Sequence, residues 1–255
     1  MTQHKFPQDV VTLSIDVGGS GLKAALLDKT GEMVSERVRI ETPYPCPPER
    51  LVSTIVELSN QLPGFHRVSV GFPGLVRDGR VFNIPSLSKS TLEGEVDPKL
   101  VELWDGFDLA QALDDAFHTP VRVANDADVQ GSAVINGEGF EFVITLGTGC
   151  GSALFFDGRL LPHLELGHAP FRKGFTYEEQ IGNAARREVG KERWARRVLK
   201  AIDSFDSFLF FDHIYVGGGN ARLLVDLGID LGPKATIVSN TAGILGGIAI
   251  WERDI

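Results

Sequence analysis

The sequence predicts an α/β protein with two similar lobes around a cleft. A buried strand over 10–17 leads through a glycine-rich turn at 18–21 into two further strands of an antiparallel meander. The same order of strand, Gly/Ser/Thr turn, strand and Asp-Gly turn recurs over 140–160. Because a repeated supersecondary unit indicates duplicated lobes, we divide the chain into an N-terminal lobe, 1–120, and a C-terminal lobe, 121–255.

The other segments of the first lobe follow from periodicity and turn residues. Besides a third meander strand over 33–40, we expect a helix over 49–60, a strand over 67–74, an irregular segment over 83–105 and a helix over 109–117. Three strands before the first helix do not make the start of a Rossmann fold, in which a helix follows the first strand.

The second lobe ends in helices and a segment of small residues. We expect helices over 176–189 and 190–205, a strand over 212–216 and a C-terminal helix over 240–251. The last helix is rich in glycine and alanine, so it suits close packing. We expect it to pack back on the N-terminal lobe.

The composition is that of an ordinary globular protein. Of 255 residues, 43% are hydrophobic and 23% are charged, which excludes a disordered chain. A formal charge of −9 disfavours nucleic acid or an anionic membrane as a partner. Residues 1–9 lack an apolar signal core, and no run reaches the about 18 apolar residues of a membrane span. Cys46 and Cys150 form no CxxC or Cys/His cluster, so we expect a reduced, cytoplasmic protein.

The segment 121–128 places carboxylates at the end of a strand. Its first residues alternate as a strand does, and Asn125, Asp126 and Asp128 follow where a helix opens. Ligands of open α/β sheets bind at the carboxyl ends of strands, because the loops there line a crevice. We therefore predict that Asp126 is the general base of a phosphoryl transfer and that Asp128 caps the helix.

A set of motifs occurs in one order along the chain. They are Ile15-Asp16-Val17-Gly18-Gly19-Ser20-Gly21-Leu22-Lys23, Asn125-Asp126-Ala127-Asp128, Leu146-Gly147-Thr148-Gly149-Cys150-Gly151, Glu165-Leu166-Gly167-His168 and Val216-Gly217-Gly218-Gly219-Asn220. Together they resemble the ROK family of sugar kinases, and within it the polyphosphate glucokinases, over nearly the whole chain. The resemblance implies the actin-like ATPase (ribonuclease-H-like) fold with two duplicated βββαβα lobes, and it implies a homodimer.

The resemblance also implies the acceptor site. In the family, the aspartate matched by Asp126 accepts the proton of the sugar's 6-hydroxyl, and the residue matched by Asn125 hydrogen-bonds the sugar. Glu165 and His168 match residues that bind sugar hydroxyls. Without the resemblance, a histidine such as His168 is more often a surface or core residue than a ligand. Asn83 begins a segment that differs from the family pattern, so its role as a further sugar ligand and the identity of the hexose stay open.

Two glycine turns have the chemistry of a phosphate site. Glycine leaves backbone N–H groups open to a phosphate and Ser20 adds a hydroxyl, whereas the alternative is plain hairpin turns. Asp16 suits Mg2+ held through water, or else it caps the turn. Lys23 either neutralises phosphate charge or lies on a solvated face. The predicted phosphate-binding residues are Asp16, Gly18, Gly19, Ser20, Gly21, Lys23, Gly147, Thr148, Gly149 and Gly151.

A second group of residues is assigned to the nucleotide or polyphosphate. The assignment to Gly217, Gly218, Gly219 and Asn220 rests on the resemblance. Arg193 and Arg197, with Arg196 and Lys200, share a helix face beside Trp194 that can follow a polyanion by charge alone. The alternative is a solvated face balanced by neighbouring glutamates.

The chain also departs from the family pattern. Many ROK proteins carry a cysteine cluster for zinc after the Glu-x-Gly-His motif, but 169–190 contains no cysteine, so we expect no zinc. ROK repressors carry an N-terminal helix-turn-helix, and because few residues precede Val10 we do not expect one here.

Together with the resemblance, these observations imply a cytoplasmic sugar kinase that uses Mg2+ and transfers a phosphoryl group from polyphosphate, ATP or both to the 6-hydroxyl of glucose. The alternatives are an ATP-dependent ROK kinase for mannose or an N-acetyl amino sugar, and a sugar sensor that binds without turnover. A sensor has no need of Asp126 as a base. Glu165 and His168 disfavour an actin-like filament or ATPase module.

Overall fold

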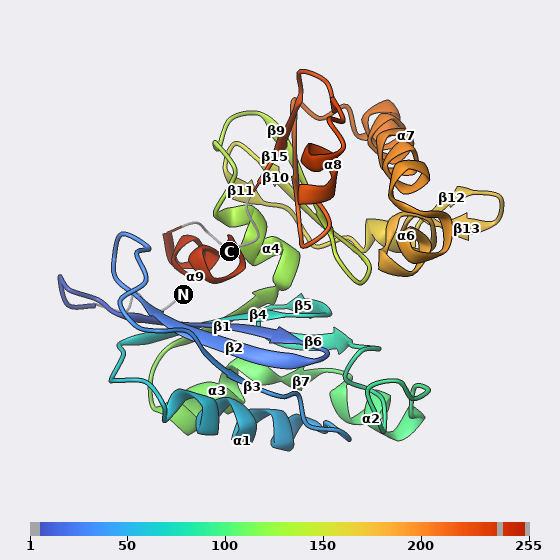
Figure 1. The fold of residues 1–255 in the computed structure, drawn as a ribbon. Coiled ribbons are helices and arrows are strands. Elements are labelled where there is room, and N and C mark those ends of the chain that lie inside the picture. The colour runs from blue at the N-terminus through green and yellow to red at the C-terminus, as the bar shows by residue number, and fades with distance from the viewer. Residues whose placement is uncertain (1–5, 239–241, 253–255) are drawn as a thin grey trace. The chain divides into compact units, whose positions relative to one another are not determined.

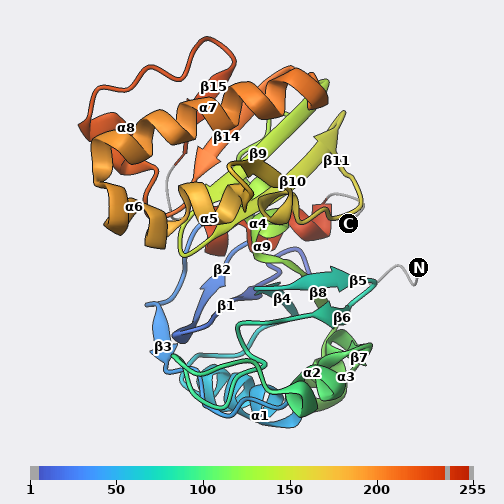
Figure 2. The same cartoon turned by 90° about the vertical axis from the view of Figure 1, so that its right-hand side faces the viewer.

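A computed structural model describes residues 6–238 and 242–252. The chain divides into two compact units, one formed by 1–133 and 243–255 and the other by 134–242. Each unit is built around a five-stranded sheet with helices packed on it (Figures 1 and 2). None of the helices described is long and apolar enough to cross a membrane.

The sheet of the first unit has the strand order β3-β2-β1-β4-β8. β1 runs antiparallel to β2 and parallel to β4, and β8 runs parallel to β4. Side chains alternate along β1, so Leu13 and Ile15 enter one core while Ser14 meets Gly247 on the other face. The strands are β1 (Thr12–Gly18), β2 (Gly21–Leu27), β3 (Val38–Ile40), β4 (Arg67–Phe72) and β8 (Val121–Asn125).

Helices cover both faces of this sheet (Figure 1). One face packs on α1 (Pro48–Ser59) and α3 (Leu109–Phe117), whose buried leucines join the core of β1 and β4. The other face packs on α4 (Asp126–Ser132) and α9 (Ala242–Glu252). In α9, Gly246 lies against the backbone of Val129 and Gly247 lies against Ser14, so the small residues permit a close approach to the sheet and α4.

Three expectations for the first unit are corrected. The lobe boundary at residue 120 is wrong, because β8 hydrogen-bonds to β4 and completes the first sheet, so the unit runs to residue 133 and includes Asp126. The strand expected over 33–40 is confined to β3. The segment 83–105 is not wholly irregular, since Asp97 caps α2 (Pro98–Trp104), and a small sheet lies beside it. That sheet comprises β5 (Leu75–Arg77), β6 (Arg80–Asn83) and β7 (Phe107–Asp108).

The sheet of the second unit has the order β11-β10-β9-β14-β15. Its pairings repeat those of the first sheet, with β9 antiparallel to β10 and parallel to β14. The expected duplication is therefore confirmed. Each of these two sheets has five strands, however, whereas the expected βββαβα order of elements contains four. The strands are β9 (Phe140–Leu146), β10 (Cys150–Phe156), β11 (Arg159–Leu160), β14 (His213–Gly217) and β15 (Ala235–Ile237).

Helices of the second unit pack along its sheet (Figure 2). The helix expected over 176–189 is broken at Gly182, where a side chain would lie 2.9 Å from the carbonyl oxygen of Thr148. The elements are the 3-10 helix η1 (Leu166–His168), β12 (Pro170–Arg172), β13 (Phe175–Thr176), α5 (Tyr177–Ile181), α6 (Asn183–Val189), α7 (Lys191–Leu209) and α8 (Arg222–Asp226).

Candidate active site

The carboxyl ends of three parallel strands bring two aspartates to one edge of the first sheet. In the strand register, Asp16 of β1 lies beside Gly71 of β4, which lies beside Ala124 of β8. Asp126 follows at the first position of α4, and a Cβ added at Gly71 would lie 3.7 Å from its Cα atom. Because Gly71 has no side chain, nothing from the middle strand stands between the two aspartates.

Asn125 fixes the start of α4. Its Oδ1 accepts a hydrogen bond from the Ala127 amide at 2.8 Å, and its Nδ2 donates to the carbonyl oxygen of Gly74 at 3.0 Å. The Ala127 amide also donates to Asp126 Oδ1 at 2.8 Å, so the half-buried carboxylate has a defined position. The cap predicted for Asp128 belongs to Asn125 instead, because Asp128 lies inside the first turn and is only 3% exposed.

Asn83 lies close to the same edge. It ends β6 with its side chain in solvent, and its carbonyl oxygen fills the space that a side chain on Gly74 would need. Gly74 in turn accepts from Asn125. Asn83 and Asn125 therefore both contact Gly74, which brings the two predicted sugar ligands close to each other.

The first glycine turn is held by side chains from β3 and from the segment that follows it. Thr42 Oγ1 donates to Gly18 O at 2.5 Å and the Tyr44 hydroxyl to Gly19 O at 2.7 Å. Arg39 Nη2 donates to Ser20 O at 3.2 Å. In a planar trans peptide the N–H points opposite to the C=O, so the N–H groups of Gly19 and Ser20 face away from these side chains.

Sequence reasoning missed these three holding residues. They lie in and beside a proline-rich connection whose local pattern indicates only a chain reversal. Burial raises the pKa of the Tyr44 phenol, so this hydroxyl stays protonated and remains a donor at neutral pH.

Asp16 and Lys23 form a cross-strand pair. They are opposite each other in the β1-β2 register, and Lys23 Nζ lies 3.2 Å from Asp16 Oδ2. The lysine is therefore directed to the edge that carries Asp16 and is not simply a solvated side chain, although an exposed pair of this kind adds only about 0–1 kcal/mol of stability.

The second glycine turn is shorter than expected. Gly147 N–H donates to Gly149 O at 3.1 Å, which closes a turn of Gly147, Thr148 and Gly149. Gly151 lies in β10 and pairs with Thr145, so it is a strand residue and not part of the turn. The Asn183 amide at the start of α6 donates to the carbonyl oxygens of Gly147 and Thr148, both at 3.1 Å.

The Gly217-Gly218-Gly219-Asn220 segment packs on this second turn. Gly218 has a φ of +87°, and a side chain there would lie 2.5 Å from Leu146 O, so the position requires glycine. Asn220 is buried, and its Nδ2 donates to Gly147 O at 3.2 Å. The structure therefore brings two motifs that are distant in sequence into direct contact.

Glu165 and His168 lie at the two ends of η1 in the second unit. His163 Nε2 is 3.3 Å from Glu165 Oε1, and this hydrogen bond is the main reason that the pKa of Glu165 is lowered. His168 is exposed, with Nε2 3.8 Å from Glu178 Oε2. Glu178 also occupies the space that a side chain on Gly149 would need.

His163 and Glu178 are the residues of this group that sequence reasoning missed. Glu178 is one of two adjacent glutamates in the first turn of α5, and only the fold shows that this one faces His168 and the glycine turn. The carboxyl groups of Glu165 and Glu178, together with the imidazole of His168, offer the acceptors and donors that a polyol needs.

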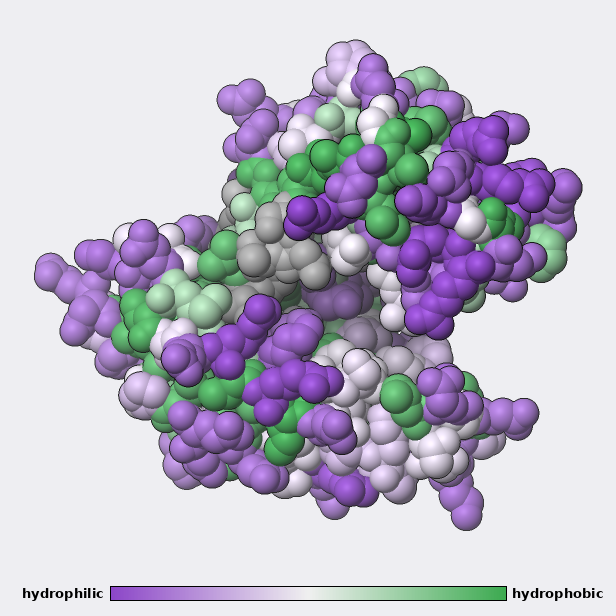
Figure 3. Space-filling model, in the orientation of Figure 1, coloured by the Kyte–Doolittle hydropathy of each residue, from purple (hydrophilic) through white to green (hydrophobic). Residues whose placement is uncertain are grey.

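The basic face of α7 lies opposite its buried side. Trp194 is on the buried side, whereas Arg193 and Arg196 are exposed. Arg197 is half-buried, and its Nη1 donates to Gln180 O at 3.4 Å. In the view of Figure 3, the surface over α6, α7 and β12 is largely hydrophilic.

The described residues contain no group of three or more His, Cys, Asp or Glu side chains that could hold a metal ion. Mg2+ is usually held by one or two carboxylates together with the phosphates of a substrate, so such a group is not required. Asp16 fits this need, since its side chain is partly exposed at the sheet edge.

Comparison with known proteins agrees with this arrangement of motifs. The ROK family model matches residues 12–183. The chain belongs to the ROK family. It is 30% identical over 247 residues to a polyphosphate glucokinase of Mycobacterium tuberculosis, covering 91% of this chain and 88% of the relative.

Solved structures of ROK proteins share the fold. The crystal structure of inorganic polyphosphate/ATP-glucomannokinase from Arthrobacter sp. strain KM matches with a TM-score of 0.79 and 29% identity, covering 95% of this chain and 98% of that one. A ROK family glucokinase from Streptomyces griseus, in complex with glucose and AMPPNP, matches with a TM-score of 0.72 and 19% identity over 93% and 98%. The family and the actin-like fold expected from the motifs are confirmed.

Proposed function

We propose that this ROK protein is a hexose kinase that transfers a phosphoryl group from inorganic polyphosphate or ATP to the 6-hydroxyl of glucose. The observation that carries the proposal is the position of Asp126, at the start of α4 and in the row of strand ends that also holds Asp16. The relatives named polyphosphate glucokinase and polyphosphate/ATP-glucomannokinase support the choice of donor and hexose.

Asp126 acts as the general base. The 6-hydroxyl oxygen attacks the terminal phosphorus of the donor, the bond from that phosphorus to its bridging oxygen breaks, and the carboxylate takes the hydroxyl proton. ADP or a polyphosphate shorter by one unit leaves. The Ala127 amide and Asn125 support this step, because they hold the carboxylate in one position at the start of α4.

The sugar is recognised by carboxylates, amides and imidazole. Glu165 stays ionised because its pKa is lowered, so it accepts hydrogen bonds from sugar hydroxyls at neutral pH. His168 and Glu178 form a second such group. Asn125 still has one amide hydrogen beyond the one given to Gly74, and the exposed Asn83 is a further ligand.

The donor is bound by backbone N–H groups and cations. The first glycine turn presents the N–H groups of Gly19 and Ser20, and Lys23 adds a positive charge nearby. The second turn and the glycine segment of 217–220 supply the corresponding backbone groups of the second unit. Mg2+ bound at Asp16 would offset the negative charge of the phosphates. We also propose that the protein is a homodimer and that it works in the reduced cytosol.

The test combines a substrate panel with one conservative variant. Coupled assays with ATP and with polyphosphate across glucose, mannose and N-acetyl amino sugars identify the pair that reacts. Asp126→Asn is expected to lower kcat by about 100-fold or more while glucose binding changes little, because the amide keeps the shape but accepts no proton. Glu49→Gln is the matched control, since Glu49 is an exposed carboxylate in the first turn of α1.

If Asp126→Asn keeps the wild-type kcat, Asp126 is not the general base. Sugar binding without transfer from either donor would identify a sensor. Mannose is the second candidate substrate, because the name glucomannokinase of the Arthrobacter protein includes it. A higher kcat/KM for mannose than for glucose would decide in its favour.

A further inference from the structure

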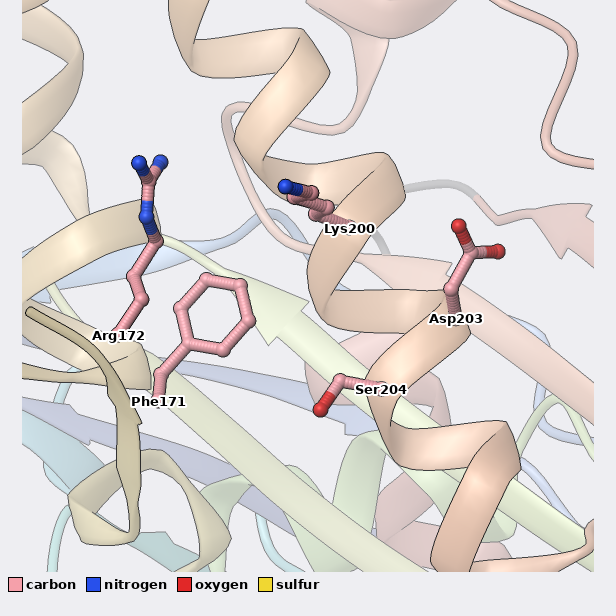
Figure 4. A pocket seen from close by; sticks show the side chains of 5 residues that line it. All are labelled: Phe171, Arg172, Lys200, Asp203 and Ser204. Carbon is pink, nitrogen blue, oxygen red and sulfur yellow. The ribbon is translucent and has the colours of Figure 1, made fainter.

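A pocket of about 440 Å³ lies between β12 and α7 in the second unit. It is lined by Phe171, Arg172, Lys200, Asp203 and Ser204 (Figure 4). A volume in the range of about 300–1,000 Å³ is typical of sites for small ligands. None of these five residues belongs to the motifs assigned to sugar or donor.

The pocket carries two cations from different elements. Arg172 is on β12 and Lys200 is on α7, and no carboxylate among the described residues lies within 4.0 Å of either. In the view of Figure 4 the Arg172 guanidinium and the Lys200 ammonium both lie above the Phe171 ring, and the Asp203 carboxylate is directed away from Arg172. In a protein of net charge −9, such a pair favours an anion.

The wall of the pocket is a fixed aromatic stack. The Phe171 ring stacks on Tyr177 with centroids 4.5 Å apart, and Tyr177 stacks on Phe205 at 4.1 Å. The Tyr177 and Ser204 hydroxyls are hydrogen-bonded at 2.7 Å. These contacts hold β12 on α7, so the backbone that carries Arg172 is positioned before any ligand binds.

One short helix connects this pocket to the second glycine turn. Tyr177, which supports the pocket wall, is followed directly by Glu178, whose carboxylate lies on Gly149. Arg197 Nη1 ties the basic face of α7 to the same helix by donating to Gln180 O at 3.4 Å. The pocket and the turn therefore lie on two sides of α5 within one unit.

We infer that this pocket binds distal phosphates of the polyphosphate donor, with Arg172 and Lys200 as the anion ligands. The inference rests on the proposed function. An Arg guanidinium and a Lys ammonium from two elements match a ligand whose charges repeat along its length. The exposed Arg193 and Arg196 on the same helix extend the positive surface beyond the pocket. The pocket would thus distinguish long donors from ATP.

The test compares donors of different length in charge-removing variants. Arg172→Gln, Lys200→Gln and the double variant are assayed with long-chain polyphosphate, tripolyphosphate and ATP. We expect the KM for long-chain polyphosphate to rise about tenfold in the double variant, which corresponds to about 1.4 kcal/mol of lost binding free energy. The KM for tripolyphosphate and for ATP is expected to stay within about twofold of wild type.

Lys191→Gln and Arg187→Gln are the matched controls, because both residues are exposed on α7 and α6 and outside the pocket. An unchanged KM for long chains, or an equal rise in the controls or with ATP, would overturn the inference. Melting temperatures of all variants should match wild type, because the substituted side chains make no ion pair with a described residue.

A failure of the proposed function is recognised separately. If the wild-type protein shows no transfer from polyphosphate, calorimetric titration with long-chain polyphosphate and with inorganic phosphate still tests the pocket. Binding that is lost in the double variant would support a phosphate-anion site, and the inorganic phosphate arm shows whether free phosphate alone fills it. No binding to wild type, or equal binding to wild type and the double variant, would contradict the site itself.

Discussion

The side-chain amide of Asn125 joins two segments, because Nδ2 donates to Gly74 O at 3.0 Å while Oδ1 accepts from the Ala127 amide at 2.8 Å. One buried residue thus fixes both the loop after β4 and the helix that begins with Asp126. The position of the proposed base depends on this double contact.

Asn125→Ala should lower the free energy of unfolding by about 2–4 kcal/mol. It removes a helix cap, worth about 1 kcal/mol, and leaves the buried Gly74 carbonyl without this donor, which costs about 1–3 kcal/mol. Urea unfolding measures the change. Asn60→Ala is the control, since Asn60 is exposed after α1 and makes no side-chain cap. An equal loss in both variants would contradict the role of Asn125.

Tyr44→Phe should raise the KM for the phosphoryl donor about threefold to tenfold and leave the affinity for glucose unchanged. The hydroxyl that is removed bonds to Gly19 O at 2.7 Å and to Ser86 O at 3.0 Å, so the first glycine turn loses a fixed orientation. Steady-state kinetics with each substrate varied in turn measures both quantities. Tyr215→Phe provides the same chemical change at a buried tyrosine outside this turn. A donor KM that stays at the wild-type value in Tyr44→Phe would refute the positioning role.

Glu165 should make stability fall as the pH drops through the acid range. Its folded-state pKa is lowered from 4.5, chiefly by the hydrogen bond from His163, so the unfolded chain binds more protons there. The contribution is fully present above the unfolded pKa and is lost as pH falls through the lower folded pKa. Urea unfolding between about pH 3 and pH 6 measures the slope. Glu165→Gln should flatten it, and an unchanged slope would show that Glu165 does not contribute.

Gly247→Ala should destabilise the protein by about 1–3 kcal/mol, the usual cost of forcing an extra methyl into a packed core. The added Cβ would meet Ser14 Oγ and lie 3.3 Å from Ser69 Cβ, and Ser69 Oγ also donates to Gly247 O at 2.5 Å. Gly64→Ala is the matched control, because a Cβ there meets no atom within 4 Å. Thermal unfolding compares the two, and equal melting temperatures would refute the close approach of α9.

Local patterns in the sequence predicted the elements and the repeat. Strand alternation and glycine turns over 10–40 and 140–160 depend on neighbouring residues only, so the duplicated meander could be inferred and the sheets confirm it. The placement of Asp126 directly after a strand followed in the same way. The boundary between the units did not, because β8 joins the first sheet through hydrogen bonds to β4, which is distant in sequence.

For the candidate site, too, some features were predicted from the sequence and others are shown only by the tertiary structure. The motif order predicted which residues carry the chemistry, and the family match confirms the resemblance on which that prediction rests. Only the tertiary structure shows that Thr42 and Tyr44 hold the first glycine turn, that Glu178 lies on Gly149, and that Arg172 and Lys200 line one pocket. The physical reason is that short-range steric and hydrophobic periodicity determines local structure, whereas contacts between distant side chains are fixed only when the sheets and helices pack.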